Sequence, residues 1–417
     1  MKMKALIVWL VLSLFSGCTQ QTNQSGGLIS GQAQSPEMQS EFVQESHNSV
    51  SSDTSVKTKI AENMLLDEFT VVNTDSLRNP NGEMRYTEVM SSLCDENYLY
   101  FKKQEDSPFS TLLYRIDKRT GENSLVANAN YTGESDVQSR GAMLFGNIAY
   151  EALSNVHGVN YPHPNAQSDI MEYNLLTTTA YISFYYRNFT SLTADKLDEK
   201  SYVTLGYGTT YENDIGQSEY TYYLTRHDVG DKATELRTYS LEWSWSNSSN
   251  IIDMRTDKGK IYVLHPIHKA VEYQISIYDG DGSTLEIIPA DELYSLGHTR
   301  RFEVRNNCFV IDNSETMKVF TLENGIFTNL SLPAEENQIS LLGIWKDYLV
   351  FQSVRSVAHN LYVLDTITRQ WTTIPITGSE KYPDGFFYLT GNGGVVAICY
   401  SLADEREYYL YNDTLFQ

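Results

Sequence analysis

The sequence predicts an all-β fold, a β-propeller of seven four-stranded blades closed by an N-terminal strand. The first observation is a strand-and-turn unit that recurs seven times, and the second is a last unit that lacks its outer strand. Each unit ends in an Asp or Asn turn, and successive turn residues are 41 to 57 positions apart: Asp117, Asn174, Asp228, Asp279, Asn324, Asp365 and Asn412. A strand repeat of roughly 50 residues is typical of a propeller, because no blade can bury both faces alone. The units between residues 130 and 250 are the least regular, so six or eight blades are the alternatives.

The chain begins with the features of an export signal. Lys2 and Lys4 precede Ala5–Phe15, an apolar stretch of eleven residues that ends before Ser16, Gly17 and Cys18. As a helix this stretch spans about 16 Å, which is too short to cross a hydrocarbon core of ~30 Å. The run Leu14-Phe15-Ser16-Gly17-Cys18 resembles a bacterial lipobox, which implies a signal peptide at 1–17 and acylation of Cys18. An ordinary secretory signal is the alternative, because Phe15 stands where a lipobox usually has an aliphatic residue.

Residues 18–60 form the second predicted region, a flexible linker. The segment is rich in Gln, Ser, Thr, Asn and Gly and has no apolar period, so it cannot bury enough surface to offset its ordering entropy. As a coil, such a linker reaches on the order of 35–40 Å. We therefore expect a propeller at 61–417, anchored through Cys18 to a membrane of the bacterial cell envelope and facing outside the cytoplasm.

The chain is strongly acidic, with 53 Asp and Glu against 31 Lys and Arg and a formal charge of −22. This charge argues against nucleic acid as a partner. Three cysteines remain besides Cys18, and Cys308 and Cys399 lie in apolar runs, where buried free thiols are the expectation. A disulfide between Cys94 and Cys399 is the alternative.

Each unit also contains an earlier, nearly continuous apolar strand, as expected for strands covered on both sides by neighbouring blades. These strands are Tyr98–Phe101, Asn147–Tyr150, Tyr202–Leu205, Lys260–Leu264, Cys308–Ile311, Tyr348–Phe351 and Val395–Ile398. A short strand such as Ser124–Val126 or Trp371–Ile374 follows the turn. The last unit stops five residues after Asn412, so we expect Met64–Val72 to supply its missing outer strand.

The run Tyr98–Phe101 followed by Leu113–Asp117 resembles bacterial lipoproteins whose propeller is similar to that of low-density-lipoprotein receptors. The turn Asp117–Gly121 also resembles the blades of outer-membrane assembly propellers and quinoprotein dehydrogenases. The resemblance spans residues 64–417 and implies extracytoplasmic binding. The motifs are short, and no Tyr-Trp-Thr-Asp run occurs in the chain.

Recognisable catalytic motifs are absent from the sequence. It has no Gly-x-Ser-x-Gly elbow, phosphate-binding loop or His-Glu-x-x-His helix, and its five Trp residues are too few for quinoprotein blades. His265 with His268, and His157 with His163, have no third ligand near them. Asp279–Ser283 lacks the terminal acid of a calcium loop, so a plain hairpin turn is expected. We expect no metal and no cofactor.

Polar residues on the first strand of each blade are the candidates for a site, because these strands line the central funnel. Asp253 and Arg255 on one first strand, and Glu303 and Arg305 on the next, place acids and bases together, and Arg140 holds a similar place in the second blade. They predict either a ligand-binding or catalytic cluster, or structural ion pairs around a water-filled channel.

A second candidate site is an aromatic platform. Trp243 and Trp245 lie on one face of a strand, and Tyr239 lies four residues before Trp243 on the same face. When exposed, such rings stack on sugars or peptides, whereas buried rings pack one blade against the next. The long connection Ser154–Ser168 is the third candidate, because long loops in compact domains often shape binding faces.

The function expected from these features is a lipid-anchored, extracytoplasmic binding module for a peptide, glycan or protein partner. The first alternative is a carbohydrate-active enzyme, a hydrolase or lyase, that uses Asp253 and Glu303. A scaffold subunit of an envelope assembly machine is the second.

Overall fold

The computed structural model describes most of the chain after residue 57. The described ranges are 58–78, 87–106, 109–130, 137–155, 167–176, 179–187, 190–212, 218–230, 233–243, 252–266, 273–290, 301–312, 317–335, 338–353, 359–378, 380–383, 385–401 and 403–417. They belong to a compact unit that spans Lys57–Gln417. The predicted signal peptide, Cys18 and most of the linker lie outside the described residues.

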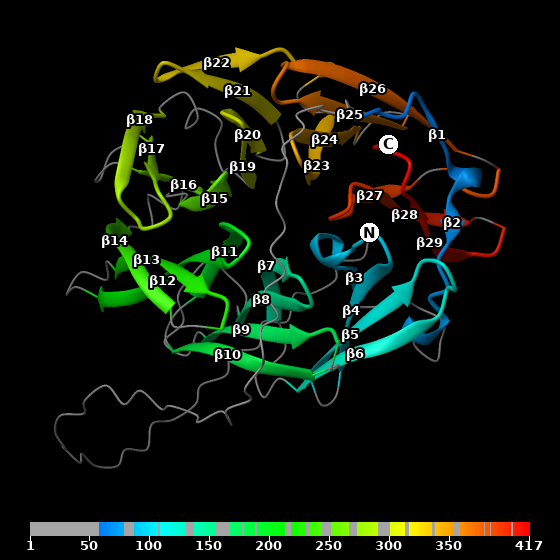
Figure 1. Ribbon diagram of the computed structural model, residues 1–417, viewed down its shortest axis with the longest axis horizontal. Helices are drawn as coiled ribbons and strands as arrows, with labels where there is room; N and C mark the ends of the chain where they lie inside the picture. The colour runs from blue at the N-terminus through cyan, green and yellow to red at the C-terminus, as the bar shows by residue number, and fades with distance from the viewer. Residues whose placement is uncertain are drawn as a thin grey trace, which may run out of the picture. The chain divides into compact units, whose positions relative to one another are not determined.

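Seven sheets, antiparallel except for one added strand, form the blades of a propeller, as predicted (Figure 1). Blade 1 comprises β3 (Thr87–Val89), β4 (Tyr98–Asp106), β5 (Phe109–Asp117) and β6 (Asn123–Asn130). Blade 2 comprises β7 (Val137–Phe145), β8 (Ile148–Asn155), β9 (Gln167–Asn174) and β10 (Thr179–Arg187). Blade 3 comprises β11 (Thr190–Lys196), β12 (Ser201–Glu212), β13 (Ser218–Asp228) and β14 (Ala233–Trp243). Blade 4 comprises β15 (Asp253–Asp257), β16 (Lys260–Pro266), β17 (Tyr273–Tyr278) and β18 (Thr284–Pro289).

The other three blades continue the same order around the ring. Blade 5 comprises β19 (Arg301–Arg305), β20 (Cys308–Asp312), β21 (Met317–Glu323) and β22 (Ile326–Leu330). Blade 6 comprises β23 (Ile339–Trp345), β24 (Tyr348–Ser353), β25 (His359–Asp365) and β26 (Gln370–Thr377). Blade 7 has only β27 (Phe386–Leu389), β28 (Val395–Ser401) and β29 (Arg406–Asn412) from its own repeat unit. The first strand of each blade lies nearest the central channel (Figure 1).

The repeated Asp and Asn residues stand at the end of the third strand in each blade or one position after it, and in five blades the side chain accepts a backbone N–H of the following turn. Asp117 Oδ1 accepts hydrogen bonds from the backbone N–H groups of Arg119 and Thr120, at 2.8 and 2.9 Å. Asp365 does the same for Ile367 and Thr368. The repeated Asp and Asn residues therefore mark turns in which a side-chain oxygen, and not a backbone carbonyl, accepts the N–H groups of the turn.

The apolar core is divided among the interfaces between blades. The central residues of the second strands are buried wherever the structure describes their side chains, and in β20 every residue but the last is buried. The described residues form seven hydrophobic clusters, each built from two neighbouring blades. In one of them, Tyr262 and Ile275 of blade 4 pack with Phe302 and Phe309 of blade 5. Each blade is thus stable only against its neighbours.

The N-terminal segment closes the ring, but as two strands rather than one. β2 (Thr70–Val71) pairs antiparallel with β29 and supplies the fourth strand of blade 7. β1 (Met64–Leu65) instead pairs parallel with β26 and becomes a fifth strand of blade 6. The 3₁₀ turn η1 (Leu66–Glu68) separates them, and its Leu66 is buried between blades 6 and 7. The segment Met64–Val72 therefore joins both blades.

Cys94, Cys308 and Cys399 are buried free thiols, so Cys94 and Cys399 form no disulfide. Burial raises the pKa of Cys94 to about 12 and that of Cys308 to about 11. Helical structure in the described ranges is limited to η1 and two further 3₁₀ turns, η2 (Asp75–Leu77) and η3 (Ser91–Leu93). Within the same ranges, no helix has the length and apolar character needed to cross a membrane.

Candidate functional site

An ion-pair cluster joins the first strands of blades 4 and 5. Arg255 Nη1 lies 2.8 Å from Asp253 Oδ1 on the same strand, and Arg255 Nε lies 2.7 Å from Glu303 Oε1 on β19. Arg255 Nη1 also donates to Thr193 Oγ1 of blade 3, at 2.9 Å. The guanidinium of Arg255 therefore pairs with both Asp253 and Glu303, the two acids that the sequence suggested as catalytic carboxylates.

The charges in this cluster depend strongly on one another because all three side chains are largely buried. Burial raises the pKa of Asp253, and Arg255 opposes the rise. Burial disfavours the charged form of Arg255, but Asp253, Glu303 and Asp195 more than compensate and raise its pKa. The arrangement is that of a structural ion pair between blades, in which the arginine stays charged.

Arg305 does not pair with Glu303 of its own strand. Its Nη1 lies 2.8 Å from Oδ1 of Asp257, a buried residue at the end of β15. The other oxygen of Asp257 accepts the backbone N–H of Asn306 at 2.7 Å. In the same way Asp195 of blade 3 accepts the backbone N–H of Thr256 at 2.8 Å. A carboxylate at the end of one first strand therefore fastens the first strand of the next blade.

A second buried network links blades 1 and 2. Lys102 Nζ lies 2.8 Å from Glu151 Oε1 and 3.3 Å from Glu88 Oε2. Tyr173 donates its hydroxyl to the other oxygen of Glu151 at 2.8 Å. Glu151 is only 1% exposed, so this network is paired and largely internal, whereas the Glu88 side chain is 56% exposed.

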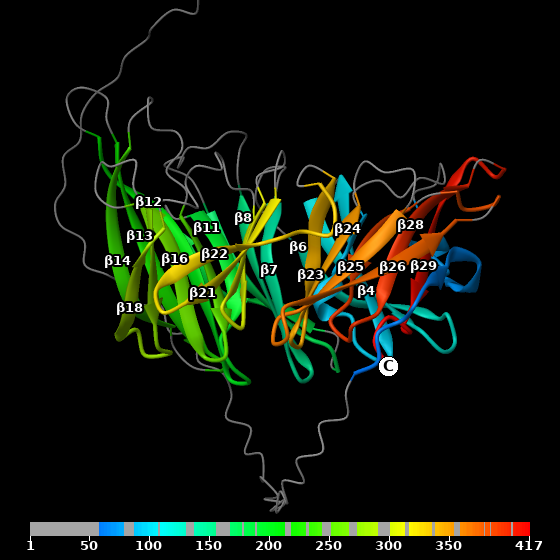
Figure 2. The same ribbon diagram turned by 90° about the horizontal axis from the view of Figure 1, so that it is seen from above.

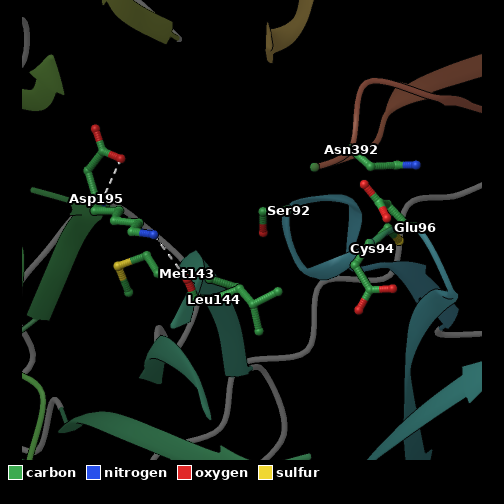
Figure 3. Close-up of a pocket in the computed structure, with 11 residues that line it drawn as sticks. Ser92, Cys94, Glu96, Met143, Leu144, Asp195 and Asn392 are labelled. Atoms are coloured by element: carbon green, nitrogen blue, oxygen red, sulfur yellow. Dashed lines mark hydrogen bonds between the residues drawn. The ribbon is translucent and has the colours of Figure 1, made fainter. Parts of the chain in front are cut away.

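A cavity of about 410 Å³ is lined by residues at or beyond the ends of the first strands. We call this side of the ring the turn face, and it is the lower edge of the ribbon in Figure 2. The walls of the cavity come from blades 1, 2, 3 and 7. In Figure 3, Asp195, Met143 and Leu144 stand on one side, and Ser92, Cys94, Glu96 and Asn392 stand on the other. Asp95, Ala142, Lys196 and Gly391 complete the lining.

Carboxylates dominate the polar lining of this cavity. Lys196 is engaged by the carbonyl of Leu144 at 3.3 Å and by Glu199 Oε2 at 2.8 Å. Burial, reinforced by Glu303, raises the pKa of Asp195 to about 6, although Arg255 and the Thr256 N–H oppose the rise. The volume of the cavity lies within the general range of small-ligand sites, roughly 300 to 1,000 Å³, and Ala142, Met143 and Leu144 give it an apolar side.

None of the other sequence candidates is among the described residues that line this cavity. Arg140 lies at a bulge of β7 between Ser139 and Gly141, and its side chain is outside the described residues. Tyr239 on β14 donates to the Tyr278 hydroxyl at 2.7 Å and packs between blades 3 and 4. The side chain of Trp243, all of Trp245 and residues 156–166 lie outside the described residues.

In the motifs considered as metal sites, the described residues His265 and Asp279 form hydrogen bonds with other protein groups. His265 bonds to Ser276 Oγ at 2.9 Å, and His268, His157 and His163 fall outside the described ranges. Asp279 Oδ1 accepts the backbone N–H groups of Asp281 and Ser283, as in a hairpin turn. Across the described residues, no three His, Cys, Asp or Glu side chains gather in a metal-binding group.

Three residues that matter here escaped the sequence reasoning: Asp195, Asp257 and Glu151. Asp257 follows Arg255 at the same spacing at which Asp253 precedes it, so the alternation along Asp253–Asp257 could have revealed it. Asp195 lies on β11, a strand without an apolar pattern, and only the assembled ring shows that it faces the cavity.

Known structures resemble the chain in fold. An oligogalacturonate lyase in complex with manganese matches with 11% identity and a TM-score of 0.45, over 76% of this chain and 86% of the lyase. The propeller domain of the Trilobed protease from Pyrococcus furiosus matches with 11% identity and a TM-score of 0.42, over 69% and 84%. An acylaminoacyl peptidase matches with 12% identity and a TM-score of 0.47, over 79% of this chain and 51% of the peptidase.

No model of a known protein family matches the sequence, and no curated protein does. The similarity to solved structures is one of fold alone. The resemblance to lipoprotein propellers stays a prediction.

Proposed function

We propose that this protein is a lipid-anchored, extracytoplasmic propeller that binds a peptide, glycan or protein partner at the turn face of its central channel. The cavity there is the observation that carries the proposal, because it joins apolar residues of blade 2 to carboxylates from blades 1 and 3. Its position also suits the fold, since side chains from several blades converge only at the channel. Anchoring through Cys18 rests on the lipobox-like run alone.

The state of the two funnel acids favours binding over catalysis. A glycosidase needs one carboxyl group free to protonate the leaving group and another free to attack or activate water. Asp253 Oδ1 and Glu303 Oε1 each lie within ion-pair distance of Arg255, so both acids are engaged by the same cation.

A carbohydrate-active enzyme is the second candidate, and one observation favours it. Asp195 lies on the cavity wall with a pKa raised to about 6, within the range useful to a general acid or base. This candidate would be favoured over the first if the wild-type protein cleaves a soluble polysaccharide and the Asp195→Asn variant does not.

The test of the binding function is a combined peptide and glycan array probed with the chain from Thr19 onward, followed by a variant that fills the cavity. Ser92 is exposed and lies at the cavity, so Ser92→Trp should weaken binding to the best array ligand at least tenfold while leaving the unfolding midpoint unchanged. Thr373→Trp, at an exposed position on β26, is the matched control. Equal binding by wild type and Ser92→Trp would rule out the cavity as the binding site.

A further inference from the structure

Blade 7 presents three exposed aromatic rings on its first two strands, β27 and β28. Phe386 is 75% exposed, Tyr388 is 37% exposed, and Tyr400 on β28 is 46% exposed. Residues between them along the strand, such as Phe387 and Leu389, are buried between blades 6 and 7. The exposed rings are therefore a separate set that the core of the blade does not use, and we call Phe386, Tyr388 and Tyr400 the blade 7 patch.

The strand register places the three rings on one face of the sheet. Phe386 is directly opposite Ile398, and Tyr388 is directly opposite Val396. Tyr400 is two residues beyond Ile398, so it points to the same side and lies diagonal to Phe386. Side chains at such diagonal positions are close enough for large rings to form a continuous surface.

Carboxylates border this surface. Glu407 is directly opposite Tyr400 on β29, so its side chain lies on the same face. The second carboxylate is Glu88 of blade 1, which is 56% exposed and also pairs with Lys102 at 3.3 Å. Burial raises the pKa of the Tyr388 phenol, and Glu88 and Glu407 raise it further, which places both carboxylates in electrostatic range of this ring.

The other face of the same sheet shows what such rings attract. Tyr408 is opposite Cys399, so it points away from the patch. Lys381 Nζ lies over the rings of Tyr408 and Tyr382, 5.2 and 5.0 Å from their centroids, and the Arg406 guanidinium lies 5.0 Å from the Tyr408 centroid. Within the described part of the chain, no Lys or Arg lies over a ring of the blade 7 patch.

We propose that the blade 7 patch binds lysine or arginine side chains of a basic peptide. Aromatic faces and nearby carboxylates both favour a cation, and the formal charge of −22 adds long-range attraction for a basic partner. The proposal goes beyond the binding function proposed above and uses different residues, so either can fail without the other. The three rings stand on strands rather than loops, which keeps them in position before the ligand arrives.

The test is calorimetric titration of a hexa-arginine peptide into the chain from Thr19 onward, at low and at physiological salt. The variants Phe386→Leu and Tyr400→Leu remove rings without changing charge, so general electrostatic attraction stays the same. Each should weaken binding about 2- to 30-fold, the range expected for one cation–π contact. Phe386→Trp should bind at least as tightly as wild type, and Leu176→Ala, at an exposed apolar site in blade 2, is the matched control.

Two results would overturn the proposal. In the first, Phe386→Leu and Tyr400→Leu bind hexa-arginine as tightly as wild type. In the second, the two variants lose affinity for an uncharged hexasaccharide such as cellohexaose but not for the peptide, which would make the patch a sugar platform. The cavity variant Ser92→Trp should leave peptide binding at the patch unchanged, and this separates the two sites.

Discussion

At the scale of single residues, Asp195 has the most consequential environment on the cavity wall. Its pKa rises from an ordinary 3.8 to about 6, because burial disfavours the carboxylate and Glu303 adds a second negative charge. Its oxygens nevertheless accept the N–H groups of Lys196 and Thr256, at 2.9 and 2.8 Å. Asp195 therefore links blade 3 to blade 4, although burial and the nearby Glu303 disfavour its negative charge.

This conflict predicts a pH dependence that can be isolated by substitution. Between about pH 4 and pH 6 the folded state holds the Asp195 proton more tightly than the unfolded state, so stability falls as pH rises through this window. The full effect is up to about 3 kcal/mol at pH 7, since one pKa unit corresponds to about 1.4 kcal/mol. Asp195→Asn keeps an acceptor oxygen but removes the titration.

We therefore expect Asp195→Asn to gain stability relative to wild type as pH rises from about 4 to about 7, with the difference levelling off above the folded-state pKa of about 6. Urea unfolding of both proteins across this range measures the difference directly. A difference that stays constant, or that shrinks with rising pH, would contradict the raised pKa.

At the scale of elements, the ionic contacts between first strands are what hold the walls of the channel. Arg255 links β15 to β19 through Glu303 and reaches β11 through Thr193. Its replacement by Met would leave Asp253 and Glu303 largely buried and without their cation. The loss of one partner from a buried ion pair costs about 3–5 kcal/mol, most of it from the stranded charge.

Arg255→Met should accordingly lower the free energy of unfolding by about 3–5 kcal/mol, measured by urea denaturation. Adding Asp253→Asn and Glu303→Gln should recover most of that loss, because the two carboxylates that contact Arg255 directly are then neutral. Lys260→Met, at an exposed position on β16, is a control that should change stability little. If the triple variant is as unstable as Arg255→Met, then the loss of stability in Arg255→Met does not come from carboxylates left without a cation.

Element by element, the sequence predicted the second and third strands well and the partners of the charged residues poorly. Runs such as Cys308–Ile311 are apolar because both faces are covered, and Asp365 marks a turn because its oxygen caps local N–H groups. Both signals are local. The pairing of Arg255 with Glu303, across 48 residues, depends on how one blade is rotated against the next. No local pattern contains that information.

The site was harder still to predict, because its walls come from distant parts of the chain. Asp195 and Asn392 face one cavity although blades 3 and 7 carry them. The blade 7 patch shows the same limit, since Phe386 and Phe387 are identical residues with opposite exposure. Alternation predicts that one of them is buried, but only the packing of blade 6 decides which.

At the scale of the whole molecule, stability is a property of the closed ring. Each of the seven clusters lies between two blades, so opening the ring at one interface exposes apolar surface on both sides of it. The N-terminal segment bridges the two interfaces nearest the opening. Met64, Leu66 and Phe69 are buried between blades 6 and 7, and Val72 is buried between blades 7 and 1.

A chain that begins at Asn73 should therefore lose cooperative folding. Burying four apolar side chains contributes about 1.5–3 kcal/mol each, or about 6–12 kcal/mol in all. That amount is comparable to the whole stability of a typical domain, about 5–15 kcal/mol. Calorimetric unfolding should show a sharp transition for a chain that begins at Thr58 and a broad or absent one for the shorter chain.

A synthetic peptide of residues 58–72, added to the shorter chain, should restore the sharp transition, because β1 and β2 of the peptide would then pair with β26 and β29. If the shorter chain unfolds as sharply as the longer one, the three strands of blade 7 close the ring on their own.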